Sequence, residues 1–262
     1  MPKIIFVLLA LLVGAAGLPG ILGAQIVTDR PDFVEASVTV GAGIVQVETS
    51  AAYARSGSGS GRSAHWTTPS LLRVGIGETL ELRLETDFLT RDVSADATRG
   101  PSGFSDVAVG FKWHALDAVD ATPSLAFLVH AGLPVGSAGL RGEGVHPTLR
   151  ASAEWEFAGG YGLGMMPGLG WNPDEEGYTY GIFALVVGKS LSRRLRVFAE
   201  IALQEMPLRD AGAAVGTWDT GLSLLLRDDV QWDAALSLPA TDAADDFFFT
   251  TGISLRLNPS HP

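Results

Sequence analysis

Charged side chains recur at every second position in several segments, a spacing that sets acids and bases along one surface. Glu81, Arg83 and Glu85 alternate with leucines in the clearest of these segments. Carboxylates and guanidinium groups that share a strand face can pair as ions or select a solute by its charge. The same alternation assigns to this polar face the residues Glu48, Arg73, Glu81, Arg83, Glu85, Asp106, Lys112, Arg150, Glu154, Glu156, Arg196, Glu200, Asp219, Arg227, Asp233 and Arg256.

Residues that could carry catalysis or hold a metal form no recognisable set. His130 shares its segment with apolar neighbours, and no serine lies beside it in the pattern that a serine nucleophile and its base require. Zinc-binding histidine spacings and phosphate-binding glycine loops are absent from the sequence. The acidic stretch 171–177 lacks the order of ligands of a calcium-binding EF-hand and is expected to be a solvated loop. We therefore expect no enzyme activity, no catalytic residue, no metal site and no cofactor.

The composition excludes several classes of protein. The 262 residues are 47% hydrophobic and 18% charged, with a mean hydropathy of +0.24, which excludes intrinsic disorder. The chain has no cysteine, so a disulfide scaffold is excluded as well. A net charge of −11 argues against nucleic-acid binding, which depends on clustered lysine and arginine. Apolar side chains must therefore be buried in a core or face lipid.

The first 24 residues resemble a secretory signal peptide. Lys3 is their single charge, and an apolar run from Ile4 to Gly17 follows it. Small residues near Ala24 suit a cleavage site. A membrane anchor is the alternative, but the uninterrupted apolar run is shorter than the ~20 residues that a spanning helix needs. The sequence thus predicts an exported protein with residues 1–24 as the signal peptide.

Alternation of apolar and polar residues with a period of two is the main pattern of the remaining chain, and it predicts strands. Most of the predicted strands run 10–14 residues, a length that matches the ~9–11 residues of a tilted strand crossing a bilayer. There are about twelve: 43–56, 64–76, 79–92, 103–115, 123–135, 145–157, 161–171, 177–190, 193–206, 215–228, 230–239 and 246–258.

The connections between these strands also alternate. Odd-numbered connections are long and polar, whereas even-numbered ones are mostly tight turns. This pattern is typical of an outer-membrane barrel with periplasmic termini. Aromatic residues also gather near the strand ends, where a membrane interface favours them. We predict an all-β, transmembrane, antiparallel up-and-down β-barrel over 43–258 with a tail at 259–262; a soluble all-β protein is the weaker alternative.

Facing the polar sides inward gives a lumen lined by both signs of charge. Buried ions must be paired, so these residues could form a structural ladder of salt bridges. They could instead be a selectivity lining for a small polar or amphiphilic solute. Barrels of eight strands are filled by side chains and those of sixteen leave a channel, so twelve strands predict a narrow or plugged pore.

The segment 25–42, expected to be periplasmic, carries a distinctive motif formed by Thr28, Asp29, Arg30, Pro31 and Asp32. This motif could plug the periplasmic mouth, with the arginine paired to an acid of the lumen. Alternatively, the segment is a short lead-in whose proline stiffens the entry to the barrel. The sequence does not decide between these two arrangements.

The same motif, with Gly43, Gln46 and Glu48 after it, resembles the start of proteins in the MetA-pathway-of-phenol-degradation family of outer-membrane transporters. A later stretch with Gly103, Asp106, Gly110 and Lys112 is similar to another strand of that family, and Pro134 and Gly136 resemble one of its turns. The resemblance is spread across most of the chain. It implies a barrel and suggests transport.

We therefore expect an outer-membrane channel that passes small solutes passively, aromatic or amphiphilic solutes among them, through a charged lumen. A closed structural or adhesive barrel is the first alternative, and a lipid-modifying barrel enzyme is a weaker one. The expected partners are outer-membrane lipid, small organic solutes and, during biogenesis, the barrel-assembly machinery.

Overall fold

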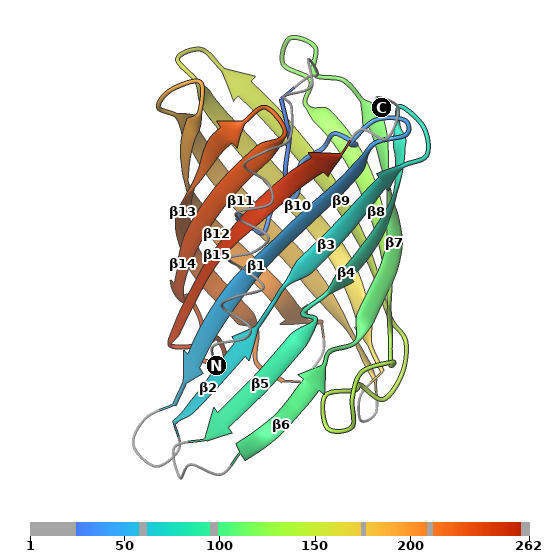
Figure 1. Ribbon diagram of the computed structural model, residues 1–262, viewed down its shortest axis with the longest axis vertical. Coiled ribbons are helices and arrows are strands. Elements are labelled where there is room, and N and C mark those ends of the chain that lie inside the picture. Colours follow the sequence, from blue (N-terminus) through green and yellow to red (C-terminus); the bar gives the residue numbers. More distant parts are fainter. Residues whose placement is uncertain (1–24, 58–61, 95–98, 174–176, 209–211, 258–262) are drawn as a thin grey trace.

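The computed structural model describes residues 25–57, 62–94, 99–173, 177–208 and 212–257 (Figure 1). The predicted signal peptide and the last five residues lie outside this range. The described residues contain no helix long and apolar enough to cross a membrane.

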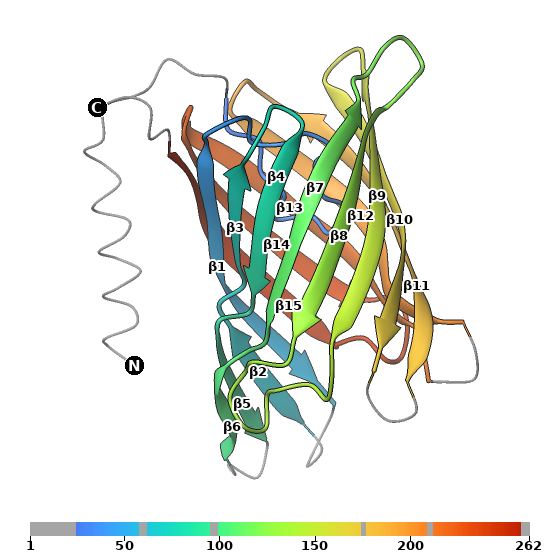
Figure 2. The same ribbon diagram turned by 90° about the vertical axis from the view of Figure 1, so that its right-hand side faces the viewer.

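The described chain forms one antiparallel sheet of fifteen strands, in which β15 pairs with β1 and closes a twelve-stranded barrel (Figures 1 and 2). The prediction of an antiparallel transmembrane-type barrel is confirmed. The strands are β1 (Val45–Ser56), β2 (Ser63–Thr67), β3 (Ser70–Gly75), β4 (Leu80–Thr86), β5 (Leu89–Ser94), β6 (Arg99–Phe104), β7 (Val107–Leu116), β8 (Ser124–Leu133), β9 (His146–Phe157), β10 (Tyr161–Asn172), β11 (Tyr178–Ser190), β12 (Leu195–Pro207), β13 (Val215–Arg227), β14 (Val230–Pro239) and β15 (Phe247–Leu257).

Three strands of the barrel wall are each interrupted once, which is why fifteen strands make a barrel of twelve. The pairs β2 and β3, and β4 and β5, occupy the ranges 64–76 and 79–92, each predicted as a single strand. β7 occupies most of the predicted strand 103–115, whereas β6 lies mainly over residues expected to form the loop before it. Pro69 follows β2 and has no N–H to donate to a ladder. Phe88, between β4 and β5, has a φ of 46°, a conformation that no regular strand contains. The first two interruptions therefore have local causes in the backbone.

Side chains alternate across the wall as the period of two predicts. Leu82 and Leu84 are exposed on the outer face, whereas Glu81 and Arg83 between them are buried inside. The outer face carries many further exposed apolar residues, among them Trp113, Phe157 and Trp218. A polar interior and an apolar exterior are the arrangement of a barrel that faces lipid.

The two rims of the barrel differ. The short-turn rim carries the tight turns, including 76–79 and 191–194, and the long-loop rim carries the longer connections such as 134–145. The strands β2, β5 and β6 extend beyond the rest of the barrel at the long-loop rim (Figures 1 and 2). In outer-membrane barrels the short turns face the periplasm and the long loops face outward.

Residues 26–40, here called the plug, lie inside the barrel (Figure 2). The plug begins at the short-turn rim, where the N–H of Ile26 donates to the carbonyl of Asp228. It returns to the same rim, where the hydroxyl of Thr39 donates to the carbonyl of Glu78. The chain thus enters the lumen, reverses near Arg30–Phe33 and leaves before β1 begins.

Two glycines let the plug pass close to the wall as it leaves the lumen. Gly41 has a φ of +88°, a conformation that residues with a side chain rarely adopt. A Cβ on Gly75, in β3, would lie 1.7 Å from the carbonyl oxygen of Gly41. The backbone just after the plug therefore contacts the wall so closely that no side chain fits between them.

Candidate functional site

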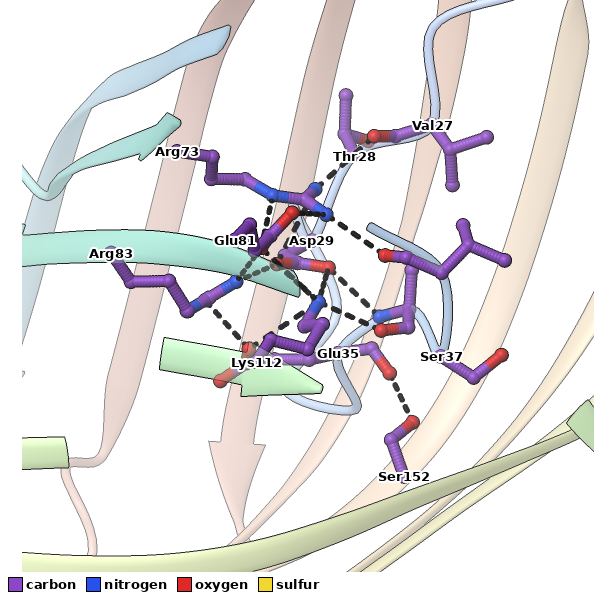
Figure 3. Close-up of polar contacts among 12 residues, drawn as sticks. Val27, Thr28, Asp29, Glu35, Ser37, Arg73, Glu81, Arg83, Lys112 and Ser152 are labelled. Atoms are coloured by element: carbon purple, nitrogen blue, oxygen red, sulfur yellow. Dashed lines mark hydrogen bonds and ion pairs between the residues drawn. The ribbon is translucent and has the colours of Figure 1, made fainter. Parts of the chain in front are cut away.

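The plug is anchored by Asp29, whose carboxylate lies among three cations from adjacent strands of the wall (Figure 3). Arg83 Nη1 lies 2.6 Å from Asp29 Oδ2, Lys112 Nζ lies 2.9 Å from both oxygens, and Arg73 Nη1 lies 3.4 Å from Oδ2. Burial raises the pKa of Asp29, but the charges of Arg73, Lys112 and Arg83 outweigh burial and hold this pKa below its ordinary value. Asp29 is therefore a buried anion whose negative charge is compensated by the three basic residues of the wall.

A second acid of the plug, Glu35, extends this ion cluster toward β9. Arg83 Nη2 lies 2.6 Å from Glu35 Oε2, and Arg150 Nη1 lies 2.5 Å from Glu35 Oε1. The hydroxyl of Ser152 donates to the carbonyl of Glu35 (Figure 3). The plug therefore contributes two carboxylates to a wall of arginine and lysine.

Acids of the wall bind backbone N–H groups of the plug. Glu48 accepts from the N–H of Asp29 at 3.0 Å, and Glu81 accepts from the N–H of Val40 at 2.9 Å. Between these two points of the plug, Glu154 accepts from the N–H of Ser37 at 2.6 Å. The plug has no strand partner here, so these carboxylates satisfy backbone donors that a sheet would otherwise pair.

The opposite wall, on β12–β15, holds the tip of the plug. Glu200 accepts from the N–H groups of Phe33 and Val34, each at 2.8 Å. Arg196 Nη1 lies 3.1 Å from Asp32 Oδ2. Arg30 donates to the hydroxyl of Thr250 at 2.8 Å, and its Nε lies 4.0 Å from Asp233 Oδ1. The tip therefore presents polar groups to this wall, where Asp32 pairs with a basic residue and Arg30 lies near an acidic one.

An apolar patch inside the lumen covers the remaining side of the plug. Val34 packs in a buried cluster with side chains of β10, β11, β12 and β14, and Phe33 packs against the cluster from the edge. The wall residues of this lumen patch are Met166, Ala184, Val186, Phe198, Ala202 and Ala235. The plug therefore shields apolar surface that would otherwise line the pore.

Substitution of Gly164 by valine is expected to displace the plug from this patch and to raise ion conductance in planar bilayers. A Cβ at this position would lie 2.8 Å from Val186 Cγ1 and 3.0 Å from Val34 Cγ1. Overpacking of this kind forces neighbouring groups to move. Gly162→Val is the matched control, because a Cβ at Gly162 meets only a backbone oxygen at 3.7 Å. Equal conductance of the two variants would contradict the expectation.

A cavity of about 550 Å³ lies between the tip of the plug and the wall. We call it the vestibule; it includes residues at the interruptions of the wall strands, on the side of the long-loop rim. Apolar groups line it together with charged ones, including Pro31, Phe33, Pro69, Leu71, Arg150 and Asp106. A small amphiphilic molecule could contact both kinds of surface there.

Most of the predicted lining residues bond directly to the plug: Glu48, Arg73, Glu81, Arg83, Lys112, Arg150, Glu154, Arg196, Glu200, Asp233 and Arg256. The others lie elsewhere. Glu85 pairs with Arg83 and His130, Asp219 accepts from the hydroxyl of Thr217, and Asp106 accepts from the N–H groups of Gly136 and Gly142. Arg227 pairs with Asp229 at the end of β13, and Glu156 is exposed at the end of β9.

The motif residues lie inside the lumen, near the reversal of the plug, and Arg30 Nε lies 4.0 Å from Asp233 Oδ1. Glu35 is not among the predicted lining residues, because it lies before the first predicted strand, in the segment expected to be periplasmic. His130, which has apolar neighbours in the sequence, faces the lumen and bonds to Arg83, Arg150 and Glu85. Within the described ranges, no group of three or more acids and histidines is arranged to hold a metal.

Comparison with known proteins identifies one matching family and several solved β-barrel structures of similar fold. The family model described as "Putative MetA-pathway of phenol degradation" matches residues 28–257. No curated protein matches the chain. An outer membrane channel from Pseudomonas putida F1 has a similar structure, with a TM-score of 0.63, 14% identity, and coverage of 87% of this chain and 99% of that one.

Two other solved barrels are similar in fold. The NanC porin has a TM-score of 0.55 at 11% identity, with coverage of 81% of this chain and 100% of the porin. The translocator domain of the autotransporter NalP from Neisseria meningitidis has a TM-score of 0.52 at 13% identity, with coverage of 83% and 89%. At these identities the likeness establishes the fold alone.

Proposed function

Because the chain belongs to the MetA-pathway-of-phenol-degradation family, we propose that it is an outer-membrane channel for passive passage of small solutes. The observation that carries the proposal is a non-covalent plug seated below an open vestibule. Asp29 and Glu35 hold this plug to the wall through ion pairs. The proposal assigns the protein no catalytic step.

The chemistry of the anchor supports a plug that can leave its seat. Taking ions out of water has a large cost, and buried ion pairs offset this cost only in part, so such pairs are weak contributors to net stability. If the plug withdraws toward the short-turn rim, water can solvate the charged groups that form ion pairs between plug and wall in the seated state. The barrel strands remain intact, because their ladders do not include the plug.

The surfaces along this path favour aromatic or amphiphilic solutes. The vestibule combines Phe33, Pro69 and Leu71 with charged groups. Once the plug leaves, the lumen patch around Met166 and Phe198 would be uncovered opposite the basic wall. A solute with one apolar and one polar side could contact both walls in the narrow lumen.

Liposome swelling tests the proposal. We expect liposomes that contain the refolded protein to swell with small aromatic alcohols, and a variant without residues 26–40 to pass larger solutes and pass them faster. Sugars of matched size are the comparison for solute chemistry. The closed structural barrel is the alternative, and it is favoured by the dense pairing of the plug. Absence of flux of any solute through both proteins would overturn the channel proposal and support the closed barrel.

A further inference from the structure

The strands β2, β5 and β6 form a small sheet that continues the barrel wall beyond the long-loop rim (Figure 1). Register places Trp66 beside Arg91 and beside Tyr53, so these three side chains share the outer face. Arg55 follows Tyr53 by two residues and lies on the same face. The outer face therefore has arginines and aromatic residues side by side.

The arginines on this sheet and directly before β2 have no anionic partner among the described residues. Arg55, Arg62 and Arg91 are exposed, and none of their side chains forms an ion pair or hydrogen bond with another described residue. The arginines of the lumen, by contrast, bond to acids or to backbone carbonyls at short range. The guanidinium groups of this patch are therefore free to bind an anion from outside the chain.

A hollow of about 210 Å³ lies next to one of these arginines. It is lined by Arg91, Asp92, Gly100 and Ser102, where the register of β5 against β6 shifts. Asp92 is already bonded to Nδ1 of His65. Arg91 and Ser102 are opposite each other in the ladder, and so they present a guanidinium and a hydroxyl to the same place. Such a pair of donors suits a phosphate group.

Apolar side chains lie on the same face, toward the middle of the barrel. Trp66 is 52% exposed and Phe104 is 54% exposed, and Leu89, the first residue of β5, is also exposed. The rings of Trp66 and Tyr53 are 4.6 Å apart. Aromatic residues of a barrel gather at the level of the lipid headgroups, with aliphatic contacts deeper. A surface with cations on the outer side and apolar side chains toward the middle of the barrel is complementary to an amphiphilic anion.

We propose that this patch, formed by Arg55, Arg62 and Arg91, binds the phosphate groups of lipopolysaccharide in the outer leaflet. The acyl chains of the lipid lie along Trp66, Leu89 and Phe104. Basic clusters at a membrane surface bind anionic headgroups in this way. The inference rests on the proposed outer-membrane location, and it does not depend on solute passage.

Native mass spectrometry of the refolded full chain in a neutral detergent tests the site, with bis-phosphorylated lipid A as the probe. We expect a R55Q/R62Q/R91Q variant to bind lipid A about tenfold more weakly or worse. The matched control is R193Q/R194Q, which removes exposed arginines at the opposite rim and is expected to leave binding unchanged. Dephosphorylated lipid A is expected to bind equally weakly to the wild type and to the variant, because it lacks the phosphate groups that the arginines would bind.

Several results would overturn the proposal. Unchanged binding in the triple variant would do so, as would equal weakening in the control. Equal binding of phosphatidylglycerol would show a generic anionic surface, and displacement of lipid A by millimolar inorganic phosphate would show a site for the free anion. Liposome swelling of the triple variant separates the two proposals. Retained swelling with lost lipid binding is expected, and absent swelling in the wild type affects the channel proposal alone.

Discussion

Asp29→Asn is expected to unseat the plug and to raise the ion conductance of the barrel severalfold. The substitution keeps the size of the side chain but removes the one carboxylate that lies within 3.4 Å of Arg73, Arg83 and Lys112. Three buried cations would then share fewer negative charges. Breaking a buried ion pair by removing one partner costs about 3–5 kcal/mol, because the remaining charge stays uncompensated. Withdrawal of the plug admits water and removes most of that cost.

Two measurements follow this change. Planar-bilayer recordings report the conductance directly. Labelling of an introduced Ala36→Cys with a membrane-impermeant maleimide reports the position of the plug, since the chain has no other cysteine and Ala36 is buried. Asp117→Asn is the control: the Asp117 side chain is 92% exposed and contacts His114 at the short-turn rim. Unaltered conductance together with unaltered labelling in Asp29→Asn would show that Asp29 does not hold the plug.

Arg83→Met is expected to cause the largest loss of stability in the lumen. Arg83 is 3% exposed and lies within 3.0 Å of carboxylate oxygens of Asp29, Glu35, Glu81 and Glu85. Removal of this cation leaves the four carboxylates with less positive charge between them, so that they repel one another more strongly. We expect a loss of about 3–5 kcal/mol, seen as a lower midpoint of heat-induced barrel unfolding by gel mobility.

The control for this variant is Arg194→Met, which removes an exposed arginine from the turn before β12, at the short-turn rim. A surface change of this kind is expected to alter stability by less than about 0.5 kcal/mol. If Arg83→Met unfolds at the same temperature as the wild type, the cluster contributes little to the barrel. A double-mutant cycle with Asp29→Asn then measures how much of the loss belongs to the pair.

The barrel itself was predictable from the sequence, because each strand carries its own alternating pattern. Leu82 and Leu84 face out and Glu81 and Arg83 face in as a period of two requires. The interruptions at Pro69 and Phe88 were not predicted, because the alternation continues on both sides of them. A proline or a single residue with positive φ changes the backbone locally without changing the polarity of its neighbours.

The sequence by itself determined the barrel, the inward face of most charged residues and the motif that contains Asp29. It left open whether that motif plugs the lumen, because residues 26–40 pair with no strand of the sheet and their position depends on contacts with distant parts of the wall. Only the tertiary structure decided that Asp29 and Glu35 lie on the basic wall while Glu200 binds the tip. Closure of the barrel brings together strands that are far apart in sequence. The position of a buried charged side chain is determined by its contacts with those strands, and not by the pattern of its own segment.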